Sequence, residues 1–176
     1  MNFIGYISNW AQTDIGHFHL ICAVIGLIVG PILFLMGKAT QKHKLYGYLF
    51  ISVMLLTNLT ALISYNLTGG FNLFHFFALI SLATILPAFY YIRRAIKTNN
   101  KRDYITHGIL MSWTYFGLVA AFLSEYYTRE FPAMLQDTEG WGIFTASLIF
   151  FFLTVGTITN KIISKKVPST IQKILK

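Results

Sequence analysis

Five long apolar runs dominate the 176-residue sequence and leave few folds open to it. Each run is close to the ~20 residues that a helix needs to cross the ~30 Å hydrocarbon layer of a bilayer. Because lipid offers no partners for backbone amides, a crossing run must be a helix unless its strands close into a barrel. Barrel strands would instead alternate in hydropathy over about ten residues. The expected spans are residues 18–37, 45–65, 71–92, 107–127 and 140–160.

The composition agrees with a membrane protein. Hydrophobic residues make up 55% of the chain and charged residues 11%, against roughly 45–50% and about 25% in soluble domains. A single cysteine, Cys22, excludes an intramolecular disulfide framework and a thiolate metal cluster. No stretch is long and polar enough for a separate soluble domain. We therefore expect residues 1–176 to form one membrane domain.

Charge predicts the direction in which the spans run. Thirteen of the 14 basic residues fall in the connections around 38–44 and 93–102 and in the tail 161–176, and only Arg129 falls on the other side. The positive-inside rule then places the N-terminus outside and the C-terminus in the cytoplasm. The net charge of +8 reflects this topology and favours contact with anionic lipid headgroups. Nucleic acid is not an expected partner, because its binders carry basic patches on otherwise polar surfaces.

Most connections between the spans are short, which favours antiparallel neighbours and an up-down bundle. The expected fold is all-α, an integral membrane helical bundle with five transmembrane helices. The first four form the core and the fifth flanks it. The tail 161–176, interrupted by Pro168, is expected to lie as a basic segment on the cytoplasmic leaflet.

The first span contains Gly26 and Gly30 in the spacing Gly-x-x-x-Gly, followed by Pro31. Small residues four apart allow another helix to approach closely, and proline removes a helical hydrogen bond. The motif predicts helix packing. It also leaves open an oligomer or docking face through Gly26 and Gly30, or a gap shaped for a flat ligand.

The five histidines sort into two groups on this topology. His17 and His19 lie at the outer end of the first span and His75 at the outer end of the third. His43 lies at the inner start of the second span and His107 at the inner start of the fourth. Because alternate helices stand diagonally in an up-down bundle, their side chains can meet across the core. The pattern predicts one facing imidazole pair at each membrane face.

Two neutral imidazoles on opposite faces of an iron porphyrin give a bis-histidine haem suited to electron transfer. Gly47, four residues after His43 and on the same helical face, would leave room for the ring. Three alternatives remain open. The histidines could bind zinc or copper, or act as a proton relay in a transporter-like protein. They could also be interfacial residues of a non-catalytic membrane scaffold that binds no cofactor.

Several short motifs resemble the bacterial predicted membrane proteins grouped as domain-of-unknown-function family 2306. That family shows Gly-Pro, then Gly-Thr-x-x-His-Arg-x-x-Gly. The matching residues here are Gly30-Pro31, Gly37-Lys38-Ala39-Thr40-Gln41-Lys42-His43-Lys44-Leu45-Tyr46-Gly47, Phe74-His75 and His107-x-x-x-Met111. The resemblance runs from about His19 to about Pro132. The chain departs from the pattern at Lys38-Ala39-Thr40, where threonine comes later, and at Lys44, where arginine is common.

This resemblance implies a bacterial inner-membrane, multi-pass protein and selects four of the five histidines. His19 and His75 would form the outer site and His43 and His107 the inner one, with His17 a bystander. The arrangement also looks like that of transmembrane two-haem cytochromes b, which implies haem b, electron transfer and a quinone or other redox partner. Three basic residues near the inner pair could bind lipid headgroups, haem propionates or an anionic donor: Lys42, Lys44 and Arg102.

Overall fold

The computed structural model describes residues 11, 13–65, 69–131 and 138–174, and these residues form five long helices. The helices are α2 (Asp14–Leu35), α3 (Gln41–Ile63), α4 (Leu73–Thr98), α5 (Lys101–Glu130) and α6 (Thr138–Ile174). Each is long and apolar enough to cross a membrane. The prediction of an all-α chain with five candidate membrane spans is therefore confirmed.

Polar residues outside the apolar runs decide where the helices begin. The side-chain oxygens of Thr13 and Thr40 accept hydrogen bonds from the amides of Gly16 and His43, both at 3.1 Å. Asn100 accepts from the amide of Arg102 at 2.9 Å. Such caps satisfy amides that the first turn of a helix leaves unbonded. As a result α2, α3 and α5 begin before the apolar runs that the sequence marks out.

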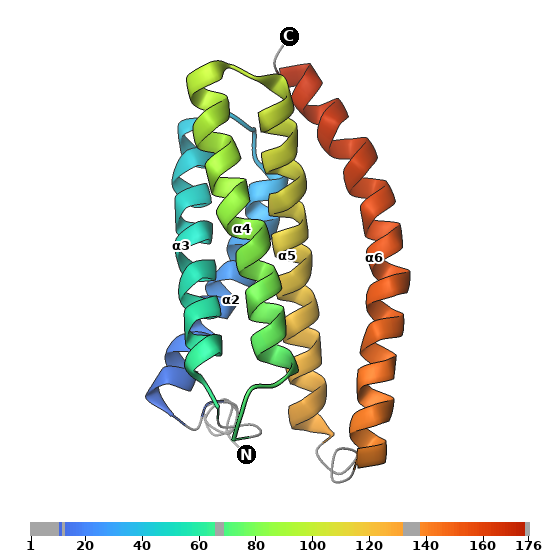
Figure 1. Cartoon of the computed structure of the whole chain (residues 1–176). Coiled ribbons are helices and arrows are strands. Elements are labelled where there is room, and N and C mark those ends of the chain that lie inside the picture. The colour runs from blue at the N-terminus through green and yellow to red at the C-terminus, as the bar shows by residue number, and fades with distance from the viewer. Residues whose placement is uncertain (1–10, 12, 66–68, 132–137, 175–176) are drawn as a thin grey trace.

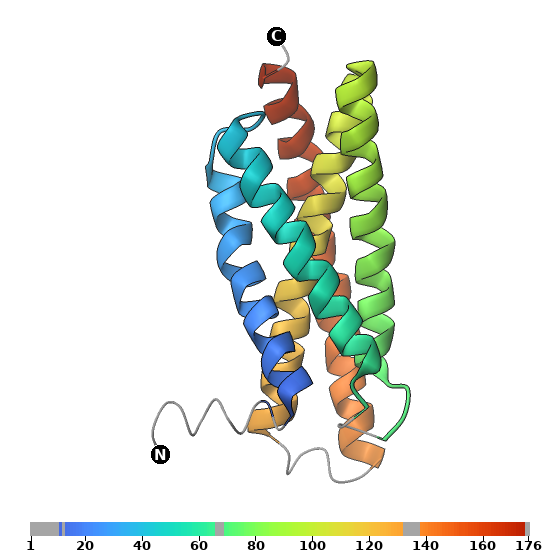
Figure 2. The same ribbon diagram turned by 90° about the vertical axis from the view of Figure 1, so that its left-hand side faces the viewer.

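Helices α2 to α5 form an up-down arrangement in which sequence neighbours pack together (Figure 1). Helix α2 packs on α3, α3 on α4 and α4 on α5, and a smaller interface between α2 and α5 closes the ring. Figure 2 shows this order from the side of α3. Within the described residues α2 and α4 are thus diagonal to each other, as are α3 and α5. Helix α6 lies outside the ring, against α5.

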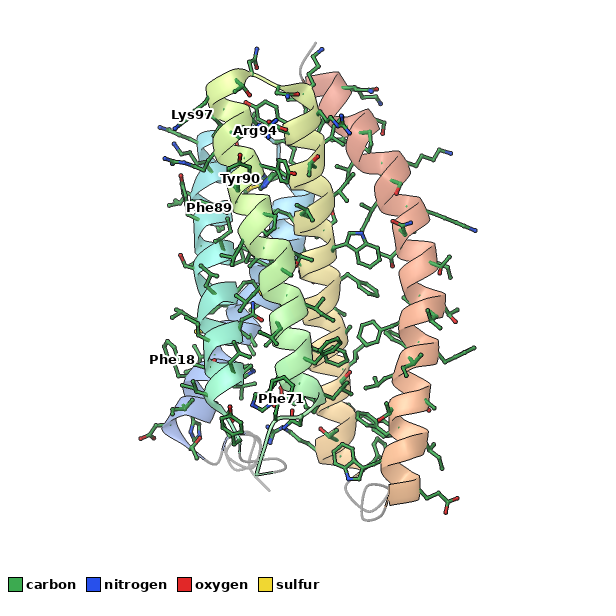
Figure 3. The ribbon with its side chains drawn as sticks, in the orientation of Figure 1. Phe18, Phe71, Phe89, Tyr90, Arg94 and Lys97 are labelled. Atoms are coloured by element: carbon green, nitrogen blue, oxygen red, sulfur yellow. The ribbon has the colours of Figure 1, made fainter. Side chains whose placement is uncertain are left out.

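The centre of the ring is filled by a small apolar cluster around Phe50, Met54, Ile85 and Leu118. Many other apolar side chains face outward, as expected where the surroundings are lipid. The two ends of the bundle differ: Figure 3 shows the cationic Arg94 and Lys97 toward one end and the aromatic Phe18 and Phe71 toward the other.

Hydrogen bonds between polar side chains join α3, α4 and α5 within the apolar interior. Asn58 donates to the hydroxyl of Ser81 at 2.9 Å, and the hydroxyls of Thr84 and Thr114 lie 3.0 Å apart. In lipid, such pairs stabilise helix association because an unpaired polar group has no water to bind. The polar residues of these spans therefore serve packing.

Gly26 and Gly30 are buried against α5 of the same chain. A β-carbon on Gly30 would lie 2.2 Å from two ring carbons of Tyr115, and one on Gly26 would lie 3.0 Å from a methyl of Leu118. The glycines thus bring α2 and α5 close enough to complete the ring. The oligomer expected through the same motif stays a prediction.

Helix α6 differs from the expected span 140–160 and its interfacial tail. It continues as one helix to Ile174, through Pro168. A β-carbon on Gly108 of α5 would meet Val167 at 2.7 Å and Ile171 at 3.3 Å, so the C-terminal turns of α6 pack on α5. The contact is formed by two apolar residues four apart on one helix face. Lysines flank them in the sequence and mask the apolar pattern. The tail 161–174 is therefore part of the packed helix.

An ion pair between a buried carboxylate and an exposed guanidinium fixes the short connection between α4 and α5. Arg94 Nε lies 2.9 Å from Asp103 Oδ2, and the side chain of Asp103 is 4% exposed whereas that of Arg94 is 46% exposed. Asn99 ends α4 in a left-handed conformation with φ of 49°, and Asn100 caps α5. Among the described residues Asp103 is the one acidic residue at the basic end of the bundle, and its charge is balanced by Arg94.

The two partners of this ion pair should not tolerate replacement equally. Arg94→Met leaves a buried carboxylate without its counter-charge, and we expect a loss of about 3 kcal/mol in the free energy of unfolding. Asp103→Asn leaves a half-exposed guanidinium that water can solvate, and we expect a loss of about 1 kcal/mol in the free energy of unfolding. Thermal unfolding in detergent measures the loss of stability in each of the two variants. Equal losses, or a larger loss for Asp103→Asn, would contradict the burial asymmetry.

Candidate functional site

The two inner histidines line one cavity at the basic end of the bundle. His43 of α3 and His107 of α5 contribute to the walls of a space of about 770 Å³. That volume lies within the ~300–1,000 Å³ typical of cofactor and small-molecule sites. Residues of all five helices line the cavity, and most of the wall is apolar or aromatic. The structure thus brings together the pair that the sequence placed at the inner face.

The ring of His107 is held by a backbone group. Its Nδ1 lies 2.9 Å from the carbonyl oxygen of Ala88 in α4. Because a carbonyl only accepts, Nδ1 carries the proton, and Nε2 of the neutral ring keeps a lone pair. Histidines that bind metals are commonly oriented by a hydrogen bond of this kind. Nε2 is therefore the nitrogen of His107 that is available to a ligand.

His43 lies in the first turn of α3, where its amide binds Thr40. Its Nδ1 is buried and has no hydrogen-bond partner. A buried polar atom without a partner is uncommon and calls for an explanation, such as a ligand or a water. Among the described residues no hydrogen bond reaches either nitrogen of this ring. The imidazole of His43 is thus free to bind a ligand in the cavity.

Gly47 lies one turn after His43 and also lines the cavity. Apart from the adjoining backbone of α3 and its chain neighbours, no atom lies within 4 Å of the position that a β-carbon would take there. This open space is what a flat ligand beside His43 requires. Gly30 also lines the cavity, but its position is covered by the ring of Tyr115, which forms part of the wall.

Four basic residues line the cavity: Lys38, Lys44, Arg93 and Lys166. The ammonium of Lys38 already has hydrogen-bond partners within the protein. It donates to the carbonyls of Leu33 and Phe34 at the end of α2, at 2.5 and 3.0 Å, and also to that of Met36. Burial lowers the pKa of Lys38, while carbonyls at a helix C-terminus favour its charged form. The other three lie on α3, α4 and α6.

Of the three basic residues that the sequence placed near the inner pair, Lys44 lines the cavity. Lys42 and Arg102 are not among its lining residues. Both lie in the first turns of helices, where they are exposed.

The outer histidines are each held by a hydrogen bond, but the structure does not join them. His19 Nδ1 lies 3.1 Å from the carbonyl oxygen of Thr57 and 2.9 Å from the hydroxyl of Thr60, both in α3. The carbonyl fixes the proton on Nδ1 and leaves a lone pair on Nε2. No hydrogen bond or ring contact connects His19 with His75 in the described part of the chain.

His75 is 1% exposed and lies between the rings of Tyr65 and Phe71, with centroids 4.7 and 5.1 Å away. Its Nδ1 lies 3.2 Å from the amide nitrogen and 3.0 Å from the Oδ1 of Asn72, so the tautomer decides whether it accepts or donates. Nε2 is buried without a hydrogen-bond partner. His17, by contrast, is exposed and binds the carbonyl of Thr13 in its own helix.

The motifs around these histidines lie within one family match. The family DUF2306, described as predicted membrane protein, matches residues 16–155. The chain belongs to DUF2306. This confirms the resemblance read from the glycine and histidine motifs. No curated protein and no solved structure matches the chain, and the likeness to two-haem cytochromes b stays a prediction.

The cavity of this DUF2306 chain includes residues that sequence reasoning missed. Arg93, Lys166, Met111 and Tyr115 all line it. Met111 carries a signal, since it lies one turn after His107 on the same face. Lys166 carries none, because nothing in the local pattern shows that α6 bends back onto α5.

The described part of this DUF2306 chain contains no group of three or more His, Cys, Asp or Glu residues that could hold a metal ion. Protein sites for zinc commonly supply three or four such ligands. A haem site needs fewer, because the porphyrin supplies four nitrogens and the protein only the axial ligands. The donor set at the inner cavity, two imidazoles on facing helices, suits haem better than a bare metal ion.

Proposed function

We propose that this protein is a haem b-binding electron-transfer protein of the bacterial inner membrane. The observation that carries the proposal is the cavity at the basic end, which His43 and His107 line from two diagonal helices. The volume, the largely apolar wall and the paired imidazoles suit an iron porphyrin.

Each part of the cavity has a role in this proposal. His43 and His107 would hold the iron through their imidazoles, and the Ala88 carbonyl fixes the ring of His107 with its Nε2 free. Gly47 would leave room for the porphyrin beside His43. Leu33 and Phe50 exclude water and keep the site apolar. When bound, the iron would supply one-electron redox chemistry, with a potential set by its ligands and surroundings.

The proposed path of electron transfer follows from the orientation of the helices in the membrane. By the positive-inside rule, the basic residues support a cavity at the cytoplasmic face and an N-terminus outside. His19 and His75 would hold a second haem at the outer face, which gives a path across the bilayer to a quinone or another redox partner. In support, each outer ring is fixed by hydrogen bonds through Nδ1.

The absorption spectrum of the purified protein tests the proposal. The chain would be expressed with ample haem, purified in mild detergent and measured oxidised and dithionite-reduced. We expect a Soret band and, on reduction, the sharp visible bands of low-spin haem b. A colourless protein that takes up no added haemin would overturn the proposal. Zinc or copper retained without a porphyrin spectrum would instead support the histidine-based metal-binding alternative.

A further inference from the structure

The last turns of α6 contribute one wall of the inner cavity. Lys166, Val167, Thr170, Ile171 and Ile174 all line it. Val167 and Ile171 are also the residues that pack over Gly108, next to His107. The position of this wall is therefore tied to the segment that carries a proposed iron ligand.

The cavity holds basic side chains that no carboxylate in the described part of the chain neutralises. Of the five acidic residues that the structure describes, four belong to the opposite end of the bundle, and the fifth, Asp103, is paired with Arg94. Within the described residues no ion pair reaches Lys44, Arg93 or Lys166. Arg93 has one hydrogen bond, to the hydroxyl of Tyr48 at 3.4 Å. These three cations can therefore balance the charge of a ligand.

An apolar cavity with cations at its wall suits an amphiphile with an anionic end. Haem b is such a ligand, since its flat apolar ring carries two propionate carboxylates. Charge-assisted hydrogen bonds from lysine or arginine to carboxylates are stronger than neutral ones and fix orientation. Lys38 is unsuited to this role because its ammonium already binds helix carbonyls.

We infer that α6 completes the haem site, with Lys166, together with Arg93 and Lys44, binding the propionate carboxylates. The inference rests on the proposed function and extends it, because it assigns the fifth helix a part in cofactor recognition. Helix α6 then does more than flank the bundle: its apolar residues close the cavity and its lysine selects a dicarboxylate porphyrin over a neutral one.

A comparison of two porphyrins tests the inference. Haemin, and haemin dimethyl ester in which both carboxylates are blocked, would be titrated into haem-free protein in nanodiscs of phosphatidylcholine, a lipid without net charge. Lys166→Met should weaken haemin binding about fivefold to tenfold and leave binding of the ester unchanged. Arg93→Met added to it should weaken haemin binding further. The matched control is Lys165→Met, which removes an exposed neighbouring charge outside the cavity.

The outcomes separate the two proposals. Equal weakening of haemin and its ester by Lys166→Met would mean that the lysine supports the fold, and would overturn the inference. Unchanged binding of both porphyrins would overturn it as well, while haem binding itself would stand. Wild-type protein that binds neither porphyrin would overturn the proposed function.

Discussion

Replacing Gly30 with alanine is expected to cost about 3 kcal/mol in the free energy of unfolding, near the upper end for overpacking a core. The new β-carbon would lie 2.2 Å from two ring carbons of Tyr115. That ring cannot turn away freely, because it packs edge-on against Phe34 and close to Phe50, and its hydroxyl donates to the Leu27 carbonyl. The interface between α2 and α5 would have to open. Thermal unfolding in detergent, followed by circular dichroism, measures the loss.

Two glycine controls make this prediction specific. Gly117→Ala adds the same methyl group to α5 where no atom lies within 4 Å, and should not reduce stability. The loss of stability in Gly26→Ala should lie between those of Gly30→Ala and Gly117→Ala, because the methyl end of Leu118 at 3.0 Å can move. If all three variants had the same unfolding temperature, the close approach of α2 to α5 would not limit stability.

Replacing either inner histidine with alanine is expected to remove the haem of the basic end. An iron that loses one of its two protein ligands is no longer held between facing helices, so the haem content per chain should fall by about half if the outer site is filled. The pyridine haemochrome assay gives the ratio of haem to protein in His43→Ala and in His107→Ala. The fold should survive, because neither ring is part of the buried cluster around Phe50 and Ile85.

Two further variants show whether this loss is specific. His17→Ala should keep full haem content, because that ring is exposed and binds only its own helix. Gly47→Leu should lose the same haem as His43→Ala without losing stability, since its side chain would enter open space in the cavity. Haem content that is unchanged in Gly47→Leu would mean that the porphyrin lies elsewhere.

The spans could be predicted from hydropathy because a bilayer forces every apolar run of that length into a helix. The helix starts could not, since polar residues such as Thr13, Thr40 and Asn100 extend the helices beyond the apolar runs. The extension of α6 was also missed. Its contact residues Val167 and Ile171 are spaced for a helix face, but lysines and a proline between them favoured an interfacial tail.

The candidate site was predictable only in part. Up-down topology was enough to bring His43 and His107 to one end of the bundle, and helical spacing was enough to put Gly47 beside the first of them. The rotation of each helix, which decides what lines a cavity, depends on packing between distant segments. The sequence therefore placed Lys42 and Arg102 near the inner pair, whereas the structure lines the cavity with Arg93 and Lys166 instead.

The identity of the two iron ligands tests the central claim most directly. Met111 lines the same cavity, and methionine is a common partner of histidine in haem proteins. Near-infrared magnetic circular dichroism of the oxidised protein distinguishes two imidazoles from one imidazole and a thioether. We predict a low-spin, bis-imidazole signature without a histidine–methionine component, and its intensity per chain should fall by about half in His43→Ala if the outer site is filled. A histidine–methionine signature, or a bis-imidazole signal that keeps its full intensity in both His43→Ala and His107→Ala, would contradict the account.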